Sequence, residues 1–299
     1  MKQIFLYIKN YWLHLNKTLF IICVAFTATA IFINYQFGLN AKINVLEEPA
    51  QYGAWVTLFL FSFVFVYAAW MLIEKKNLFL NTRFVLLLLL APLLFAWKMS
   101  VNFQFYFTAD GTTNAYYNAV IYWPLKLIVI TAALFVLWLC VDRDQPFYGF
   151  GTKQFNPLPY LILLVLMVPL IAAAATQPDF LAVYPKMKNI SFLQGESNSS
   201  FYKLLYELSY GSDFFTIELF FRGFLVLAFV KYAGKDAILP MAVFYCTIHF
   251  GKPLGECISS YFGGIILGVI TYNTKTIWGG LLVHVGIAWL MEIAGTLKL

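Results

Sequence analysis

The sequence has 299 residues, of which 62% are apolar and only 11% are Asp, Glu, Lys or Arg. An average soluble domain is about 25% charged, so this composition argues against a water-soluble globule. Aromatic residues make up 19% of the chain and the mean hydropathy is +0.76, which excludes a disordered tail or a collagen-like repeat. The net charge of +6 comes from basic residues at the ends of apolar runs, a distribution typical of membrane topology rather than of nucleic-acid binding.

Long apolar runs predict an all-α, polytopic transmembrane helix bundle. A membrane helix needs roughly 20 apolar residues, and about nine segments of near that length are present. They cover residues 19–35, 52–73, 84–101, 118–141, 158–176, 213–230, 237–250, 256–272 and 277–297. Residues 1–17 interleave aromatic residues with lysine and resemble an interfacial helix.

Lysine and arginine in short loops predict which ends of the first spans face the cytoplasm. The basic residues near the start of the chain and after the second span are Lys2, Lys9, Lys17, Lys75, Lys76 and Arg83. We therefore expect the N-terminus and the second loop inside, with Glu47 and Glu48 outside. The bias fades after residue 142, because acidic residues flank Arg143 and residues 177–211 mix both signs, so the second half has no predicted orientation.

The placement of ionisable residues divides the chain in two. The first five spans carry almost none in their interiors, Lys126 being the exception. The last four carry Glu218, Arg222, His249, Glu256, His284 and Glu292. Such groups cost about 2.5–3.5 kcal/mol each for Arg, Lys or Asp at a helix centre, so they usually face a protein interior and have a task. We therefore interpret residues 1–157 as a scaffold and residues 158–299 as the functional core.

Glu218 and Arg222 are four residues apart, on one helical face, where an ion pair lowers the cost of burying each. Alone, this pair is equally well explained as a structural salt bridge. His249 lies at the end of the span 237–250 and His284 lies in the span 277–297. Two imidazoles with one carboxylate are a common catalytic zinc set with an open position for water. There is no HExxH motif, so such a site has to be assembled from separate helices.

The motifs of the last four spans are Glu218, Arg222 and Gly223, then a histidine at the end of the next span, and then a Gly-Gly-Leu-Leu-Val-His run that ends at His284. In the order and spacing of these motifs, the last four spans resemble the CPBP family of intramembrane proteases. This family includes CAAX prenyl proteases and bacterial proteins linked to bacteriocin self-immunity. Its motifs are Glu-Glu-x-x-x-Arg, Phe-x-x-x-His and His-x-x-x-Asn. The resemblance covers residues 212–292, with Ile217 in place of the first glutamate, Tyr245 in place of the phenylalanine and Ala288 in place of the asparagine.

The resemblance implies a metallo- or glutamate-type endopeptidase that hydrolyses a peptide bond in a membrane-embedded or membrane-proximal substrate, in a bacterial cell membrane. Its implied catalytic residues are Glu218, Arg222, His249 and His284, and its implied ligands for zinc or another divalent metal are Glu218, His249 and His284. Glu256, which lies outside the three motifs, is a further candidate catalytic residue. Glu218 acts as base or ligand, with Arg222 positioning it. For Glu256, the alternative to a direct role is a favourable charge at a helix N-terminus.

Ile217 and Ala288 cannot perform the family's water activation and oxyanion stabilisation. Two alternatives to an active protease therefore remain open. One is a catalytically inactive homologue that acts as a membrane binding or immunity protein. The other is a transporter with a proton relay, which ranks last because the two halves show no inverted repeat.

Overall fold

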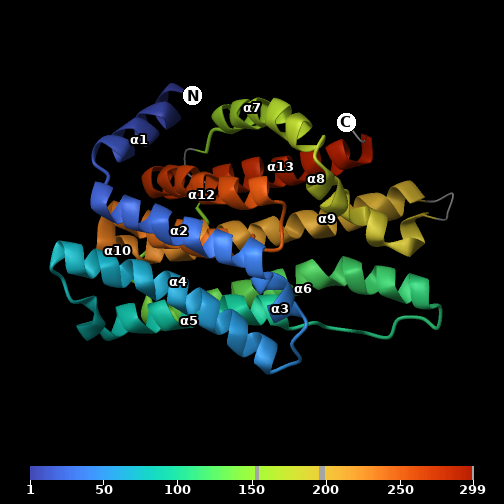
Figure 1. Ribbon diagram of the computed structural model, residues 1–299, viewed down its shortest axis with the longest axis horizontal. Coiled ribbons are helices and arrows are strands. Elements are labelled where there is room, and N and C mark those ends of the chain that lie inside the picture. Colours follow the sequence, from blue (N-terminus) through green and yellow to red (C-terminus); the bar gives the residue numbers. More distant parts are fainter. Residues whose placement is uncertain (152–154, 195–198, 298–299) are drawn as a thin grey trace.

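The computed structural model describes residues 1–151, 155–194 and 199–297. Every regular element in these ranges is a helix, and the long helices pack side by side in a bundle (Figure 1). The first half contains α1 (Lys2–Leu13), α2 (Lys17–Phe37), α3 (Leu39–Asn44), α4 (Ala50–Glu74), η1 (Leu78–Leu80), α5 (Thr82–Ser100) and α6 (Gly111–Val141). This confirms the predicted all-α class.

The second half mixes long helices with short ones. It contains α7 (Leu158–Ala174), α8 (Pro178–Val183), η2 (Lys186–Asn189), η3 (Ser191–Gln194), α9 (Ser199–Ile217), η4 (Glu218–Ala228), α10 (Val230–Ala233), η5 (Gly234–Ala237), α11 (Ile238–Thr247), α12 (Leu254–Thr274) and α13 (Trp278–Leu297). The short elements α8, η2 and η3 form one segment, residues 178–194, which we call the strap.

Six of the described helices, α2, α4, α5, α6, α12 and α13, are long and apolar enough to cross a membrane. The other three predicted spans differ from expectation. Helix α7 has 17 residues and α11 only 10, so at 1.5 Å per residue α11 covers about half of a 30 Å hydrocarbon core. The segment predicted as a span from residue 213 is the C-terminal half of a longer continuous helix, α9–η4, which begins at residue 199.

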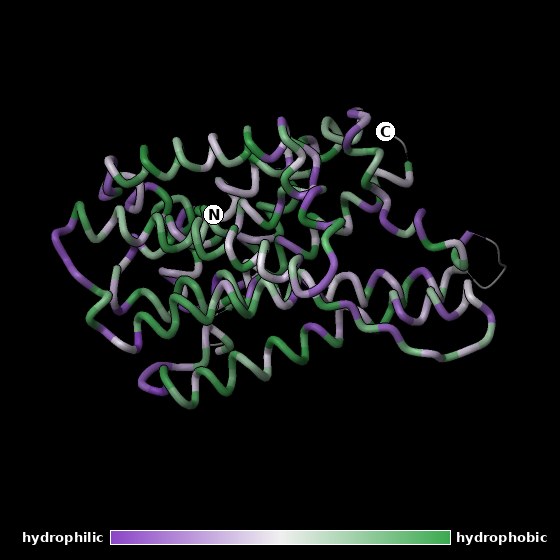
Figure 2. Tube along the Cα trace, turned by 60° about the horizontal axis from the view of Figure 1, so that its bottom comes forward, coloured by the Kyte–Doolittle hydropathy of each residue, from purple (hydrophilic) through white to green (hydrophobic). Residues whose placement is uncertain are grey.

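Side-chain caps and left-handed residues set the helix ends. Asn16, Asn81 and Asp110 accept the backbone N–H three residues later, at 3.0, 3.1 and 2.8 Å, and so satisfy N-terminal donors of α2, α5 and α6. Lys75 and Lys275 end α4 and α12 with φ of 53° and 56°. Hydrophilic residues concentrate at these ends and turns, while the helices are mainly hydrophobic (Figure 2).

Aromatic side chains form the core that fixes η4 against the N-terminal helices. The Phe95 ring of α5 lies 4.9 Å from Phe220 and 5.0 Å from Phe221, centroid to centroid. Phe244 of α11 lies 4.9 Å from Phe59 of α4 and 5.4 Å from Phe221. Each such pair adds about 0.5–1.5 kcal/mol beyond its buried area. The residues next to Glu218 are therefore anchored on two sides.

A cluster of charged side chains is buried in the bundle around Lys126, which was the one ionisable residue that the sequence predicted inside the first five spans. Lys98 of α5 pairs with Asp213 of α9 at 2.8 Å, and the Lys126 ammonium donates to the Lys98 carbonyl at 2.6 Å. Lys98 and Lys126 are both buried. Lys98 is thus another buried cation of the first half, and this cluster ties α5 and α6 to the helix that carries Glu218.

Candidate active site

Glu218 lies where the continuous helix α9–η4 changes from α-helical to π-helical hydrogen bonding. The π segment η4 runs from Glu218 to Ala228, and such widened turns occur frequently at functional sites. The glutamate side chain is 0% exposed. The predicted span 213–230 placed Glu218 near the start of a helix. In the structure the 19 residues of α9 precede it, so Glu218 lies deep along a helix.

Two cationic or protonatable groups hold one oxygen of this carboxylate. Arg222 Nη1 lies 3.2 Å from Glu218 Oε1, and His284 Nδ1 lies 3.0 Å from the same atom. The other oxygen, Oε2, is buried without a hydrogen-bond partner among the described residues. The fold therefore brings together three of the predicted site residues and leaves one carboxylate oxygen free to accept a proton.

Arg222 is completely buried and acts on Glu218 mainly through charge. Its N–H groups are not aligned with hydrogen-bond acceptors in the described part of the chain, although Nη1 is within ion-pair distance of the carboxylate. The guanidinium carbon lies 4.0 Å from the centre of the Tyr245 ring. A cation over an aromatic face in a desolvated site contributes about 2 kcal/mol, which helps to offset the cost of burying this charge.

Tyr245 also completes the environment of His284, and the sequence did not identify it as a site residue. Its hydroxyl lies 3.1 Å from His284 Nε2. A neutral imidazole that donates its Nδ1–H to Glu218 leaves Nε2 to accept from this hydroxyl, so the two contacts select one tautomer. The signal in the sequence was the tyrosine at the phenylalanine position of the second motif.

Gly280 makes the room that Glu218 occupies. A Cβ built on Gly280 would lie 2.3 Å from Glu218 Oε2, far inside van der Waals contact. The close approach of the Glu218 carboxylate therefore explains the second glycine of the Gly-Gly pair at the start of α13. Any larger residue displaces the carboxylate.

His249 lies outside this cluster. It follows α11, its Nδ1 is 2.9 Å from the Tyr245 carbonyl oxygen, and its ring is 4.6 Å from the Tyr245 ring. No hydrogen bond or ion pair joins His249 to Glu218 in the described ranges. Tyr245 is the residue that stands between the two histidines.

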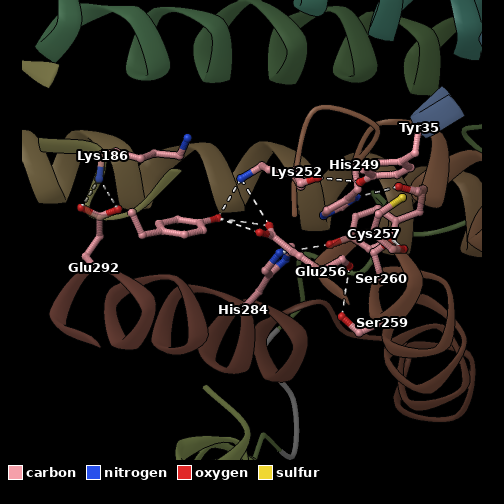
Figure 3. A network of polar contacts seen from close by, with 12 residues as sticks. Tyr35, Lys186, His249, Lys252, Glu256, Cys257, Ser259, Ser260, His284 and Glu292 are labelled. Atoms are coloured by element: carbon pink, nitrogen blue, oxygen red, sulfur yellow. Dashed lines mark hydrogen bonds and ion pairs between the residues drawn. The ribbon is translucent and has the colours of Figure 1, made fainter. Parts of the chain in front are cut away.

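Glu256, at the start of α12, belongs to a separate polar network at the strap (Figure 3). The Tyr184 hydroxyl is 3.1 Å from both of its carboxylate oxygens, and Lys252 Nζ is 3.3 Å from one of them. Lys252 Nζ also donates to the Tyr184 hydroxyl at 2.9 Å. Glu256 is therefore engaged with Tyr184 and Lys252, and in the described part of the chain it makes no hydrogen bond or ion pair with Glu218.

The strap is held to α13 by Glu292. This glutamate is buried, and both of its oxygens accept the backbone N–H of Lys186 at 2.8 Å. The Lys186 side chain extends toward Lys252 (Figure 3). Burial, together with the positive charge of Lys252, lowers the pKa of Lys186 to about 8.

The donor set does not fit a metal ion in this arrangement. Across residues 1–151, 155–194 and 199–297, no three His, Cys, Asp or Glu side chains gather closely enough to hold one. Both ring nitrogens of His284 are already hydrogen bonded, and Nδ1 of His249 faces a backbone carbonyl. Glu218, His249 and His284, the ligands that the resemblance implies, therefore do not form a ready metal site.

Ile217 and Ala288, the two departures from the motifs, are both buried. Ile217 packs in the main hydrophobic core. Neither side chain has a polar atom, so the positions of the first glutamate and of the asparagine add no proton acceptor or hydrogen-bond donor to the site.

Comparison with known proteins places the similarity in this part of the chain. Residues 212–290 match a family model described as type II CAAX prenyl endopeptidase Rce1-like, which confirms the resemblance over about a quarter of the chain. No curated protein and no solved structure matches. With six apolar helices and a segment of membrane-protease type, the chain is an integral, multi-pass membrane protein.

Proposed function

We propose, from the match of residues 212–290 to the Rce1-like family model, that this chain is an intramembrane endopeptidase that hydrolyses a peptide bond in a membrane-associated substrate. The observation that supports this most is the completely buried Glu218, held at one oxygen by Arg222 and His284 and free at the other. Leaving a buried carboxylate partly unpaired costs several kcal/mol, so such an arrangement indicates a task rather than packing.

Glu218 is the proposed general base. Its free Oε2 accepts a proton from a water molecule while the water oxygen attacks the substrate carbonyl carbon. The tetrahedral intermediate then collapses, the peptide C–N bond breaks, and the proton passes to the leaving amine. Arg222 and His284 position the carboxylate.

Tyr245 and His249 have the supporting roles. The Tyr245 hydroxyl donates its one proton to His284 Nε2 and so fixes the His284 tautomer, a contact that phenylalanine at this position lacks. His249 Nδ1–H donates to the Tyr245 carbonyl, so Nε2, which has no hydrogen-bond partner among the described residues, is the proposed acceptor for a backbone N–H of the substrate. Glu256 acts indirectly, through the contacts with Tyr184 and Lys252 that hold the strap.

A divalent metal, most simply zinc, requires His284 to give up either Glu218 or Tyr245. When bound, it would supply Lewis-acid activation of water. The reaction described above uses the chain's own residues. The proposed location is a bacterial cell membrane, which the resemblance to bacterial members of the family supports.

The decisive test compares new protein N-termini in membranes that contain the wild-type chain or Glu218→Gln. We expect a set of cleavage products that Glu218→Gln and His284→Ala abolish. Glu47→Gln, the same substitution at an exposed position outside the site, serves as the matched control and should retain them. Identical N-termini in the wild type and in Glu218→Gln would refute the assignment.

A second candidate function is a catalytically inactive membrane binding or immunity protein. The buried, apolar Ile217 and Ala288 favour it, because they replace two polar groups of the family motifs. It predicts that Glu218→Ala and His249→Ala leave the cellular phenotype intact, while substitutions in the strap abolish it. The two functions thus differ in which variants lose the phenotype.

A further inference from the structure

Hydrogen bonds and ion pairs identify which loops share each end of the bundle. At one end, contacts join the start of α2 to the end of α4, α4 to η5, and α5 to the loop after α6. The same loop after α6 also contacts α10 and the start of α13. These contacts are Asn16–Glu74 (3.0 Å), Trp70–Asp236 (3.1 Å), Arg83–Asp144 (3.9 Å), Lys231–Asp144 (3.1 Å) and Ile277–Gly149 (3.1 Å). We call residues 14–17, 74–83, 142–151, 229–237 and 275–277 the basic end.

The other end contains the loop after α11 and the strap. Contacts there are Asn34–Phe250 (2.8 Å), Tyr35–Lys252 (2.5 Å), Tyr184–Glu256 (3.1 Å) and Lys186–Glu292 (2.8 Å). Because successive helices alternate in direction, the loops after α2 and α5 and the start of α9 lie at this end as well. We call residues 38–49, 101–110, 175–194, 199–207 and 248–256 the strap end.

The two ends differ in charge. The basic end carries eight basic residues, Lys17, Lys75, Lys76, Arg83, Arg143, Lys231, Lys235 and Lys275, against the four acidic residues Glu74, Asp142, Asp144 and Asp236. The strap end carries five basic residues, Lys42, Lys186, Lys188, Lys203 and Lys252, against the six acidic residues Glu47, Glu48, Asp110, Asp179, Glu207 and Glu256. Short loops rich in Lys and Arg stay in the cytoplasm, so the basic end is cytoplasmic.

This result extends to the second half of the chain, for which the sequence predicted no orientation. Lys231, Lys235 and Lys275 lie in loops of the last four helices, and the fold places them beside the loops of the first half that are predicted to be cytoplasmic. The strap and the loop that carries His249 therefore face the opposite, extracytoplasmic side.

Among the described residues, Arg222 is the polar partner of Glu218 on the side of the basic end, and the other contact of Glu218, to His284, leads toward the strap end. His284 contacts the Tyr245 hydroxyl, and the Tyr245 carbonyl accepts from His249. The backbone N–H of Lys252 donates to the His249 carbonyl, and the Lys252 side chain pairs with Glu256 (Figure 3). Toward the basic end, buried aromatic and aliphatic side chains fill the space between the helices. They include Phe224, Phe229, Tyr148 and Ile277, each 0% exposed, and the Tyr148 and Phe224 rings are 5.3 Å apart.

We propose that the site receives its substrate from the extracytoplasmic side of the membrane. The substrate is then a peptide segment at or near the extracytoplasmic membrane surface, such as the translocated flank of a membrane protein. The identity of the ligand as a substrate rests on the proposed function. The direction in which the site opens does not depend on cleavage.

Single cysteines test the orientation. In the full-length chain with the exposed Cys140 replaced by serine, we would introduce Glu48→Cys or Lys188→Cys at the strap end and Lys76→Cys or Arg143→Cys at the basic end. Intact bacterial cells are then treated with a membrane-impermeant maleimide. We expect labelling of the strap-end pair in intact cells, and of the basic-end pair only after permeabilisation. Labelling of the basic-end pair, or failure to label the strap-end pair, in intact cells overturns the proposal.

Lys186→Cys tests the opening itself. Its side chain extends into the polar region beside Lys252 (Figure 3), so a small anionic methanethiosulfonate reagent added outside intact cells should modify it. Thr276→Cys, a buried position next to Ile277 at the basic end, is the matched control and should resist the reagent. Modification of Thr276→Cys alone would refute an extracytoplasmic opening. Loss of cleavage in Glu218→Gln is scored separately, so the proposed function and the orientation can fail independently.

Discussion

Gly280→Ala offers the sharpest test of the proposed base. The new methyl carbon would lie 2.3 Å from Glu218 Oε2, whereas ordinary contact begins near 3.4 Å, so the carboxylate has to move by about 1 Å. That movement stretches the 3.0 Å contact with His284 and the 3.2 Å contact with Arg222. A misplacement of about 1 Å in a catalytic group costs on the order of 100-fold in rate.

The same substitution should have little effect on folding. Alanine in a helix interior is favoured over glycine by about 0.5–1 kcal/mol, which partly offsets the local crowding. Gly263→Ala in α12 is the matched control, because a Cβ there meets no atom within 4 Å. We expect both variants to unfold near the wild-type temperature in lipid nanodiscs, and only Gly280→Ala to lose cleavage.

Two readouts measure this effect. One is the yield of the wild-type cleavage products, and the other is the NMR signal of the His284 ring, which reports the hydrogen bond to Glu218 without any substrate. Full cleavage by Gly280→Ala, together with an unchanged His284 signal, would refute the geometric argument for Glu218.

Three further predictions follow from individual contacts. Tyr245→Phe removes one hydrogen bond of about 1 kcal/mol from His284, so we expect roughly a fivefold loss of cleavage with unchanged thermal unfolding, and equal activity would exclude a role for the hydroxyl. Asp213→Asn leaves the buried ammonium of Lys98 without its counter-charge and should lower the free energy of unfolding by about 3–5 kcal/mol, measured by chemical denaturation; a change under about 1 kcal/mol would contradict the burial of this pair. Protein purified in nanodiscs with zinc should hold less than one equivalent by elemental analysis, and a full equivalent that is lost in His249→Ala, His284→Ala would show that the site rearranges to bind metal.

Local composition determined much of this protein. The apolar runs were long enough to predict helices in a membrane, and six of them became long helices with bounds close to those expected. The i, i+4 spacing placed Glu218 and Arg222 on one face whatever the rest of the chain did. The motif around His284 predicted that His284 and Glu218 belong to one site, because ionisable residues inside apolar spans usually face the protein interior and have a task.

Tertiary packing decided the remainder, because it depends on which helices meet and at what depth. Hydropathy could not show that the helix of Glu218 begins at residue 199, since polar residues of its first half pack on α6. Nor could spacing show that Tyr245, and not His249, contacts His284, because the depth at which a short helix ends is set by its neighbours. The orientation of the second half needed the fold as well: its few lysines carry a topological signal only once the structure places them beside the basic loops of the first half.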